Sequence, residues 1–159
     1  MSEPRHYVDV AIIGAGFAGL GTGIELKNAG ILNFVIFEGE EGVGGSWRTN
    51  TYPGCACDVP SHLYSYSFAP NPHWPEAFSR QEDIRQYIEN CADAYGMKPH
   101  IRFSTRVTDA SFDEQSGRWV ITTDDGEITE ARVLVPATGA LSHPKYPEIK
   151  GMDTFKGKA

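Results

Sequence analysis

The sequence has no long hydrophobic run and no excess of basic residues, and both absences limit what the protein does. The longest apolar stretch, residues 10–20, is interrupted by three glycines and is too short to span a bilayer. The first residues lack the basic segment and the cleavage site of a secretory signal. Acidic residues outnumber basic ones by 21 to 14, which gives a net charge of −7 and no basic surface for nucleic acid or an anionic membrane. We therefore expect a cytoplasmic protein that has neither of these as a partner.

Cysteine is also scarce. Cys55, Cys57 and Cys91 form an odd count, and no second ligand pair stands at zinc spacing from Cys55 and Cys57. The sequence therefore predicts three reduced thiols, with neither a disulfide framework nor a metal site. Its 159 residues suffice for one domain with a substantial core, and no repeat is visible.

The most informative stretch is residues 7–19, YVDVAIIGAGFAG. Its β-branched apolar run predicts a strand that is buried on both faces of a parallel sheet. Gly14, Gly16 and Gly19 follow in G-x-G-x-x-G spacing, and the next residues predict a helix that stops near Gly30. The first glycine permits a tight turn, the second lets the backbone approach a pyrophosphate, and the third lets the helix pack on the strand. The phosphates would meet unpaired N–H groups at the helix N-terminus.

A second apolar run, residues 34–37, ends at Glu38. An acid at the tip of this strand is placed to accept hydrogen bonds from a ribose 2′-hydroxyl, and it argues against a 2′-phosphate. The alternative is a solvated acid at a strand end. The order of strand, turn, helix and strand favours dinucleotide binding, with NAD or the ADP half of FAD as the ligand.

Residues 39–58 form an unusually long, glycine-rich loop. We interpret it as lying along the cofactor, with Gly44 and Gly45 allowing close backbone approach and Trp47 and Tyr52 supplying flat apolar surface. A surface loop with a structural tryptophan is the alternative. The aromatic residues of 62–74 either line a ligand cavity or cover the core, and covering the core is the commoner case.

The rest of the chain predicts a helix and a group of strands. Ser79 and Glu82 have capping-box spacing, and apolar residues at helical spacing extend the helix to Gly96. From Ile101 onward we expect three antiparallel strands, a hairpin turn at residues 123–126 and a final buried strand at 131–135. This strand-rich insertion, a β-meander, is typical of large flavin-binding domains. The predicted fold class is therefore α/β: a Rossmann-like domain with a parallel sheet and a β-meander insertion.

The final strand leads into residues 137–139, Ala-Thr-Gly, at the edge where open α/β sheets bind ligands. A simple turn has the same local pattern.

The segment from Gly44 to Asp58 matches (Ala/Gly)-Gly-x-Trp-x-x-x-x-(Phe/Tyr)-Pro-(Gly/Met)-x-x-x-Asp at every specified position. Together with the glycine fingerprint and residues 137–139, it resembles the N-terminal FAD-binding portion of the Baeyer–Villiger monooxygenases, a class B flavoprotein monooxygenase family. The resemblance covers nearly the whole chain and implies FAD as cofactor, with NADPH and O2 as co-substrates. The implied chemistry is reduction of FAD by NADPH, formation of a C4a-peroxyflavin with O2, and attack on a small-molecule ketone or soft heteroatom. A ketone would give an ester or lactone.

The resemblance also implies roles for individual residues. It places the pyrophosphate at Gly14, Gly16, Phe17 and Ala18 beside Gly19, the adenosine ribose at Glu38, and the adenine region at Val107. It places Gly45, Ser46 and Trp47 along the FAD, with Ala137, Thr138 and Gly139 closing over it. Tyr64 and Asp58 would lie near the flavin ring, and Asp58, the candidate catalytic residue, would orient an arginine. The alternative for Asp58 is a loop-capping aspartate.

Phe155-x-Gly157 resembles the opening of a further family signature, which leads into an NADPH-binding domain that carries this arginine. We therefore expect residues 1–140 to form the FAD-binding domain and residues 141–159 to be a linker toward an absent NADPH-binding domain. On this interpretation the chain alone is inactive. Two other functions stay open: a non-catalytic nucleotide-binding module that needs a partner chain, and an NAD-dependent oxidoreductase.

Overall fold

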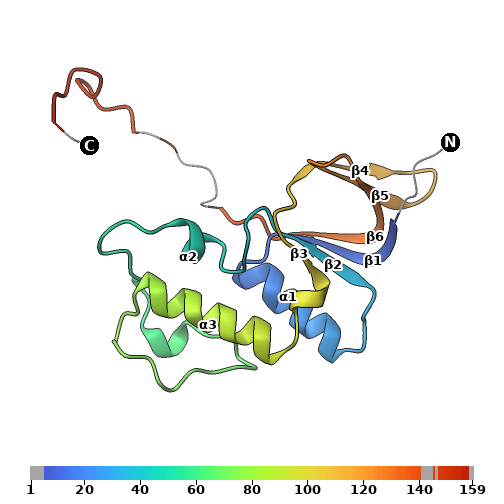
Figure 1. Cartoon of the computed structure of the whole chain (residues 1–159), viewed down its shortest axis with the longest axis horizontal. Helices are drawn as coiled ribbons and strands as arrows, with labels where there is room; N and C mark the ends of the chain where they lie inside the picture. The colour runs from blue at the N-terminus through green and yellow to red at the C-terminus, as the bar shows by residue number, and fades with distance from the viewer. Residues whose placement is uncertain (1–5, 141–144, 146, 158–159) are drawn as a thin grey trace.

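A six-stranded sheet runs through the molecule in the order β3-β2-β1-β6-β5-β4 (Figure 1). The computed structural model describes residues 6–140, 145 and 147–157. The strands are β1 His6–Ile13, β2 Phe34–Phe37, β3 Ile101–Arg102, β4 Val107–Asp113, β5 Arg118–Thr123 and β6 Ile128–Pro136. The helices are α1 Phe17–Asn28, α2 Ser46–Thr49 and α3 Gln81–Ala94, and two short 3-10 helices cover Ser61–Leu63 and Lys98–His100.

The parallel half of the sheet is centred on β1, which pairs with β2 on one side and β6 on the other. Alternate residues of β1 pack into different clusters: Val10 and Ile12 lie with α1 and α3 residues, and Ala11 lies with Phe37 and Ile121. The α1 and α3 helices lie on the same side of the sheet (Figure 1). The predicted strands at residues 8–13 and 34–37 are confirmed, because apolar residues fill both faces here.

The antiparallel half confirms the β-meander but corrects its details. The hairpin turn at residues 123–126 joins β5 to β6, with the Gly126 N–H donating to the Thr123 carbonyl at 2.9 Å. The expected first antiparallel strand is wrong, because β3 covers only Ile101–Arg102 and runs parallel to β2. Two antiparallel strands, β4 and β5, precede β6, whose first part also pairs antiparallel with β5.

The expected final buried strand exists as part of β6, but it is not buried along its whole length. Residues 131–135 are the continuation of β6, and Val133 is 46% exposed. The last pair between β5 and β6 joins Trp119 to Ala131, whereas β6 remains paired with β1 as far as Pro136. Beyond Ala131 the strand therefore has a neighbour on one side only and loses part of its cover.

Both long helices lie where the sequence predicts them. The α1 helix stops at Asn28, where Gly30 has φ +79° and the Ile31 N–H returns to the Leu26 carbonyl at 2.9 Å. The predicted capping box of α3 is wrong. Arg80 is the N-cap, with no side-chain hydrogen bond to the helix, while the Ser79 hydroxyl lies 2.7 Å from the Ser61 hydroxyl.

The expected loop at residues 39–58 contains the short helix α2, which the sequence did not predict. For residues 62–74, both alternatives apply: the aromatic residues cover the core, and Tyr66 and Phe68 also line a groove. Tyr64, Tyr66 and Phe68 pack against the main hydrophobic cluster, and Trp74 belongs to it. Backbone irregularity in this segment therefore coexists with well-packed side chains.

Three further points concern the chain as a whole. All three cysteines are buried and free. In the described part of the chain, no helix has both the length and the apolar character that crossing a bilayer requires. Of the expected linker, residues 141–144, 146, 158 and 159 lie outside the described residues, and residues 147–157 are exposed and extend away from the sheet (Figure 1).

Candidate functional site

The glycine turn at the end of β1 fits its surroundings only because it has no side chains. Gly14 has φ +100°, and a Cβ on it would lie 2.6 Å from the Ala137 carbonyl oxygen. A Cβ on Gly19 would lie 1.8 Å from the Gly14 carbonyl oxygen. The Gly14 N–H donates to the Phe37 carbonyl at 2.7 Å. The turn thereby brings the carboxyl ends of β1, β2 and β6 together, at the edge where open α/β sheets bind ligands.

Gly16 is the N-cap of α1, so Phe17 and Ala18 begin the helix. The first N–H groups of a helix have no partner inside it, and they carry the positive end of the helix dipole. The second glycine pair closes on this end: the Gly44 N–H donates to the Ala15 carbonyl at 3.1 Å. A Cβ on Gly45 would lie 3.0 Å from the Gly16 Cα. Two backbone segments thus form a cradle that can hold an anion without a cationic side chain.

Glu38 lies at the tip of β2 and is 7% exposed. One carboxylate oxygen accepts the Ala15 N–H at 2.6 Å, and the other accepts the Glu40 N–H at 2.9 Å. Each oxygen of a carboxylate has a second lone pair, so both can still accept a ribose hydroxyl. The alternative of a solvated acid is wrong, because the side chain is buried against the glycine turn.

Val107 is the first residue of β4 and lies at the same end of the molecule as Glu38. The chain just before it is tied to β2, with the Thr105 N–H donating to the Glu38 carbonyl at 2.9 Å. The Val107 side chain packs against the cluster that contains Phe37. Residues far apart in the sequence therefore meet beside Glu38, where the resemblance places adenosine.

Trp47 and Tyr64 form the other end of the site. The Trp47 indole N–H donates to the Tyr64 hydroxyl oxygen at 3.1 Å, and the two rings meet edge to face with centroids 5.7 Å apart. Phe17, at the start of α1, lies 5.1 Å from the Tyr64 ring. Ser46 and Gly45 precede Trp47, with Gly45 as the N-cap of α2. The aromatic group therefore adjoins the anion cradle.

Asp58 is exposed and acts on Tyr64 through its charge. Burial raises the pKa of the Tyr64 phenol, the hydrogen bond from Trp47 lowers it, and negative charge on an ionised Cys57 and on Asp58 raises it further. The shift is upward overall, so Tyr64 keeps its proton at neutral pH and has an O–H to donate. Asp58 is thus placed near the aromatic end of the site.

The third strand end contributes Ala137, Thr138 and Gly139. The Ala137 N–H donates to the Ile13 carbonyl at 2.9 Å, which extends the pairing of β6 with β1. Thr138 and Gly139 are exposed beyond it, and Gly139 has φ +74°. They lie at the same sheet edge as the glycine turn.

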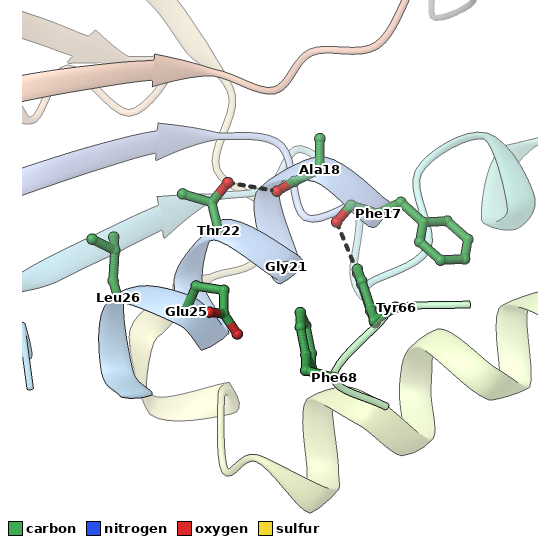
Figure 2. A pocket seen from close by; sticks show the side chains of 8 residues that line it. All are labelled: Phe17, Ala18, Gly21, Thr22, Glu25, Leu26, Tyr66 and Phe68. Atoms are coloured by element: carbon green, nitrogen blue, oxygen red, sulfur yellow. Dashed lines mark hydrogen bonds between the residues drawn. The ribbon is translucent and has the colours of Figure 1, made fainter. Parts of the chain in front are cut away.

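A groove of about 530 Å³ lies beside this site, along α1 (Figure 2). Its lining residues are Phe17, Ala18, Gly21, Thr22, Glu25, Leu26, Tyr66 and Phe68. The Tyr66 hydroxyl donates to the Phe17 carbonyl at 2.8 Å, and a Cβ on Gly21 would lie 2.8 Å from the Tyr66 ring. Tyr66 therefore holds the start of α1 from the groove side.

Sequence reasoning missed the residues that hold α2 in place. Arg48 of α2 forms an ion pair with Glu89 of α3 at 2.8 Å, and Gln81 donates to the Trp47 carbonyl. Arg48 and Glu89 are 41 positions apart, and neither lies in a specified position of a motif. No signal in a single sequence connects them.

The parts of the site form a continuous series: Glu38 contacts Ala15, Gly16 contacts Gly45, and Trp47 contacts Tyr64. An acid for hydroxyl groups, a backbone cradle for phosphates and an aromatic group follow one another in that order. This series suits a long nucleotide whose far end is an aromatic ring.

Comparisons with known proteins agree with this description. The model of the pyridine nucleotide-disulphide oxidoreductase family matches residues 11–158. A Baeyer-Villiger monooxygenase of Streptomyces coelicolor is 56% identical over 156 residues, which are 98% of this chain and 30% of the relative. The chain thus spans about 30% of the length of the curated relatives it matches.

Two solved structures are similar along nearly the whole chain. Cyclohexanone monooxygenase from Rhodococcus sp. Phi1 bound to NADP+ has a TM-score of 0.87 and 37% identity, covering 98% of this chain and 30% of that one. OTEMO in complex with FAD and NADP has a TM-score of 0.85 and 38% identity, covering 98% and 30%. The expected fold class and the expected resemblance are both confirmed.

Proposed function

The chain belongs to the pyridine nucleotide-disulphide oxidoreductase family, and we propose that it is the FAD-binding part of an NADPH- and O2-dependent flavoprotein monooxygenase of Baeyer–Villiger type. One observation carries the proposal most directly. The backbone cradle of Gly16 and Gly45 lies between a buried ribose-type acid, Glu38, and an aromatic pair, Trp47 and Tyr64. The similarity to monooxygenases along 98% of the chain supports it.

The residues present fit FAD. Gly14 and Gly19 shape the turn, and the N–H groups of Phe17 and Ala18 at the start of α1 would face the pyrophosphate. Glu38 would accept the ribose hydroxyls, and Val107 would lie at the adenine. Ser46 and Trp47 would lie along the cofactor, and residues 137–139 would close over it at the sheet edge.

FAD, once bound, supplies the redox and oxygen-transfer chemistry, and the chain supplies orientation, charge and exclusion of water. Tyr64 keeps its proton at neutral pH and can donate it in a hydrogen bond near the flavin ring. Asp58 is exposed beside it and can hold a cation contributed from outside the described residues.

Further parts of the proposal go with this assignment. Residues 1–140 would form the FAD-binding domain and residues 141–159 a linker toward an NADPH-binding domain. The substrate would be a small-molecule ketone or a soft heteroatom compound. We also propose a cytoplasmic location, in keeping with the sequence.

The first test is the visible absorption spectrum of the purified chain before and after incubation with FAD, with the released cofactor identified after heat denaturation. Retained flavin bands are expected. A colourless protein that refuses FAD but binds NAD in a titration would replace this proposal with an NAD-dependent one.

The catalytic role of Asp58 needs a protein that turns over. In a chimera of this chain with the C-terminal part of the Streptomyces coelicolor relative, Asp58→Asn should lower ester formation by about 100-fold, because a charge that orients a catalytic group is lost. FAD should stay bound. Unchanged ester formation would remove Asp58 from the mechanism and leave it as a loop-capping aspartate.

A further inference from the structure

Arg48 occupies a position that the Gly44–Asp58 motif leaves unspecified, yet its side chain joins two parts of the molecule. Its Nε donates to the Val43 carbonyl at 2.8 Å, and its Nη2 donates to a Glu89 carboxylate oxygen of α3 at 2.8 Å. The Arg48 and Glu89 side chains are 20% and 26% exposed. A half-buried pair that also has a backbone acceptor is held more firmly than an exposed ion pair.

The arginine also packs closely against two glycines in the loop before it. A Cβ on Gly42 would lie 2.2 Å from Arg48 Nη2, and a Cβ on Gly44 would lie 3.0 Å from Arg48 Cβ. The side chain therefore crosses the backbone of residues 42–44. This backbone continues into Gly45, which closes on Gly16. Arg48 thus holds the backbone that leads into the cradle.

The α2 helix needs such support. It has four residues, Ser46–Thr49, and none of them is buried. A helix this short does not persist by itself in water, because nucleation costs more than one turn returns. Its ties to α3 are the Arg48–Glu89 pair and the hydrogen bond from Gln81 to the Trp47 carbonyl.

We propose that Arg48 and Glu89 are a positioning pair, which holds Gly45 and Trp47 against the N-terminus of α1 so that the cofactor site is formed before the cofactor arrives. The proposal rests on the proposed function for the identity of the cofactor. Neither side chain touches the cofactor. The pair acts through the loop at residues 42–47. Because this loop is already ordered, the entropic cost of cofactor binding is smaller.

The test measures FAD affinity by titration for Arg48→Gln, Glu89→Gln and the double variant. Each single variant should weaken FAD binding about tenfold, and the double variant should be no weaker than either, because the two residues act as one unit. Arg48→Lys keeps the charge but loses the hydrogen bond from Nε to the Val43 carbonyl. Its FAD affinity should therefore lie between that of the wild type and that of Arg48→Gln.

Arg80→Gln is the matched control. Arg80 and Glu76 form an ion pair at 3.0 Å near the start of α3, but the two side chains are 66% and 47% exposed. This variant removes the same charge and should leave FAD affinity unchanged.

Hydrogen exchange without any cofactor separates this proposal from the proposed function. Amides of residues 42–49 should exchange faster in Arg48→Gln and Glu89→Gln than in the wild type or the control. If the wild type binds no FAD, the proposed function is wrong. The exchange rates of residues 42–49 still show whether Arg48 and Glu89 position this segment. Unchanged exchange, or an equal rise throughout β1 and α1, would overturn the positioning role and leave general stability.

Discussion

The two ends of the candidate site are built in different ways. At the phosphate end, the contacts around the glycine turn come from backbone or from one acid: Gly14 to Phe37, and Glu38 to Ala15. At the aromatic end, the chain is largely irregular and side chains hold it. Trp47 bonds to Tyr64, Tyr66 bonds to the Phe17 carbonyl, and Arg48 bonds to Glu89.

This difference determines how each end responds to change. The phosphate end depends on atoms that already lie at contact distance, so an added atom has nowhere to go. The aromatic end is the sum of several bonds of about 1 kcal/mol each, and it can lose them one at a time. The following changes test this contrast.

Gly19→Ala should have the largest effect. Its Cβ would lie 1.8 Å from the Gly14 carbonyl oxygen, so the helix and the turn would have to separate. We expect the free energy of unfolding, measured in urea, to fall by about 3 kcal/mol and FAD binding to be lost. The control is Gly30→Ala, where φ is +79° with nothing within 4 Å, and where only about 1 kcal/mol of backbone strain is expected. Equal stability of the two variants would contradict the conclusion that the phosphate end has no room for an added atom.

Glu38→Gln keeps the shape of the side chain and removes its charge. Hydrogen bonds to a charged group contribute about 2 kcal/mol, so FAD affinity should fall about 30-fold in a titration. The exposed neighbour Glu40 gives the control Glu40→Gln, which should bind as the wild type does. Affinity for FMN, which has no adenosine, should not change in Glu38→Gln. A matching loss for FMN would place Glu38 away from the ribose.

High pH should act on the aromatic side of the molecule. Burial raises the pKa of the phenols of Tyr66 and Tyr87 above the ordinary value of about 10. Above pH 10 the unfolded chain therefore loses these protons first, and unfolding becomes easier as the pH rises. The free energy of unfolding should fall by up to about 1.4 kcal/mol per pH unit for each phenol.

Urea unfolding at about pH 9, 10 and 11, which are the ordinary phenol pKa and about one unit on either side of it, measures this slope. Tyr87→Phe should flatten it, whereas Tyr7→Phe, at a side chain that is 43% exposed, is the control. A slope that Tyr87→Phe leaves unchanged would contradict the assignment.

Tyr64→Phe should have the smallest effect. It removes one hydrogen bond, from the Trp47 indole, and keeps the ring contacts with Trp47 and Phe17. FAD affinity should fall about fivefold, which corresponds to about 1 kcal/mol. In a double-mutant cycle, Trp47→Phe should add little to it. A loss as large as that of Glu38→Gln would mean that the aromatic end is as rigid as the phosphate end.

Prediction from sequence succeeded unevenly across the molecule. The strand, turn and helix at residues 8–28 followed from local periodicity and glycine spacing, and the burial of Glu38 agrees with its assigned place. The β6 strand defeated the same reasoning, because its exposure depends on where β5 ends. Ser79 looked like a helix cap, but it instead contacts Ser61 from a distant segment.

The sequence by itself determined the glycine turn at the phosphate end, because Gly14 has a positive φ, a backbone conformation that favours glycine. It also determined that an acid follows the second strand. Only the tertiary structure decided which residues hold the aromatic end. Arg48 meets Glu89, and Trp47 meets Tyr64, through packing of segments that no local pattern connects. Side-chain bonds between distant segments depend on the whole fold, whereas the positive φ that favours glycine is a local property of the turn.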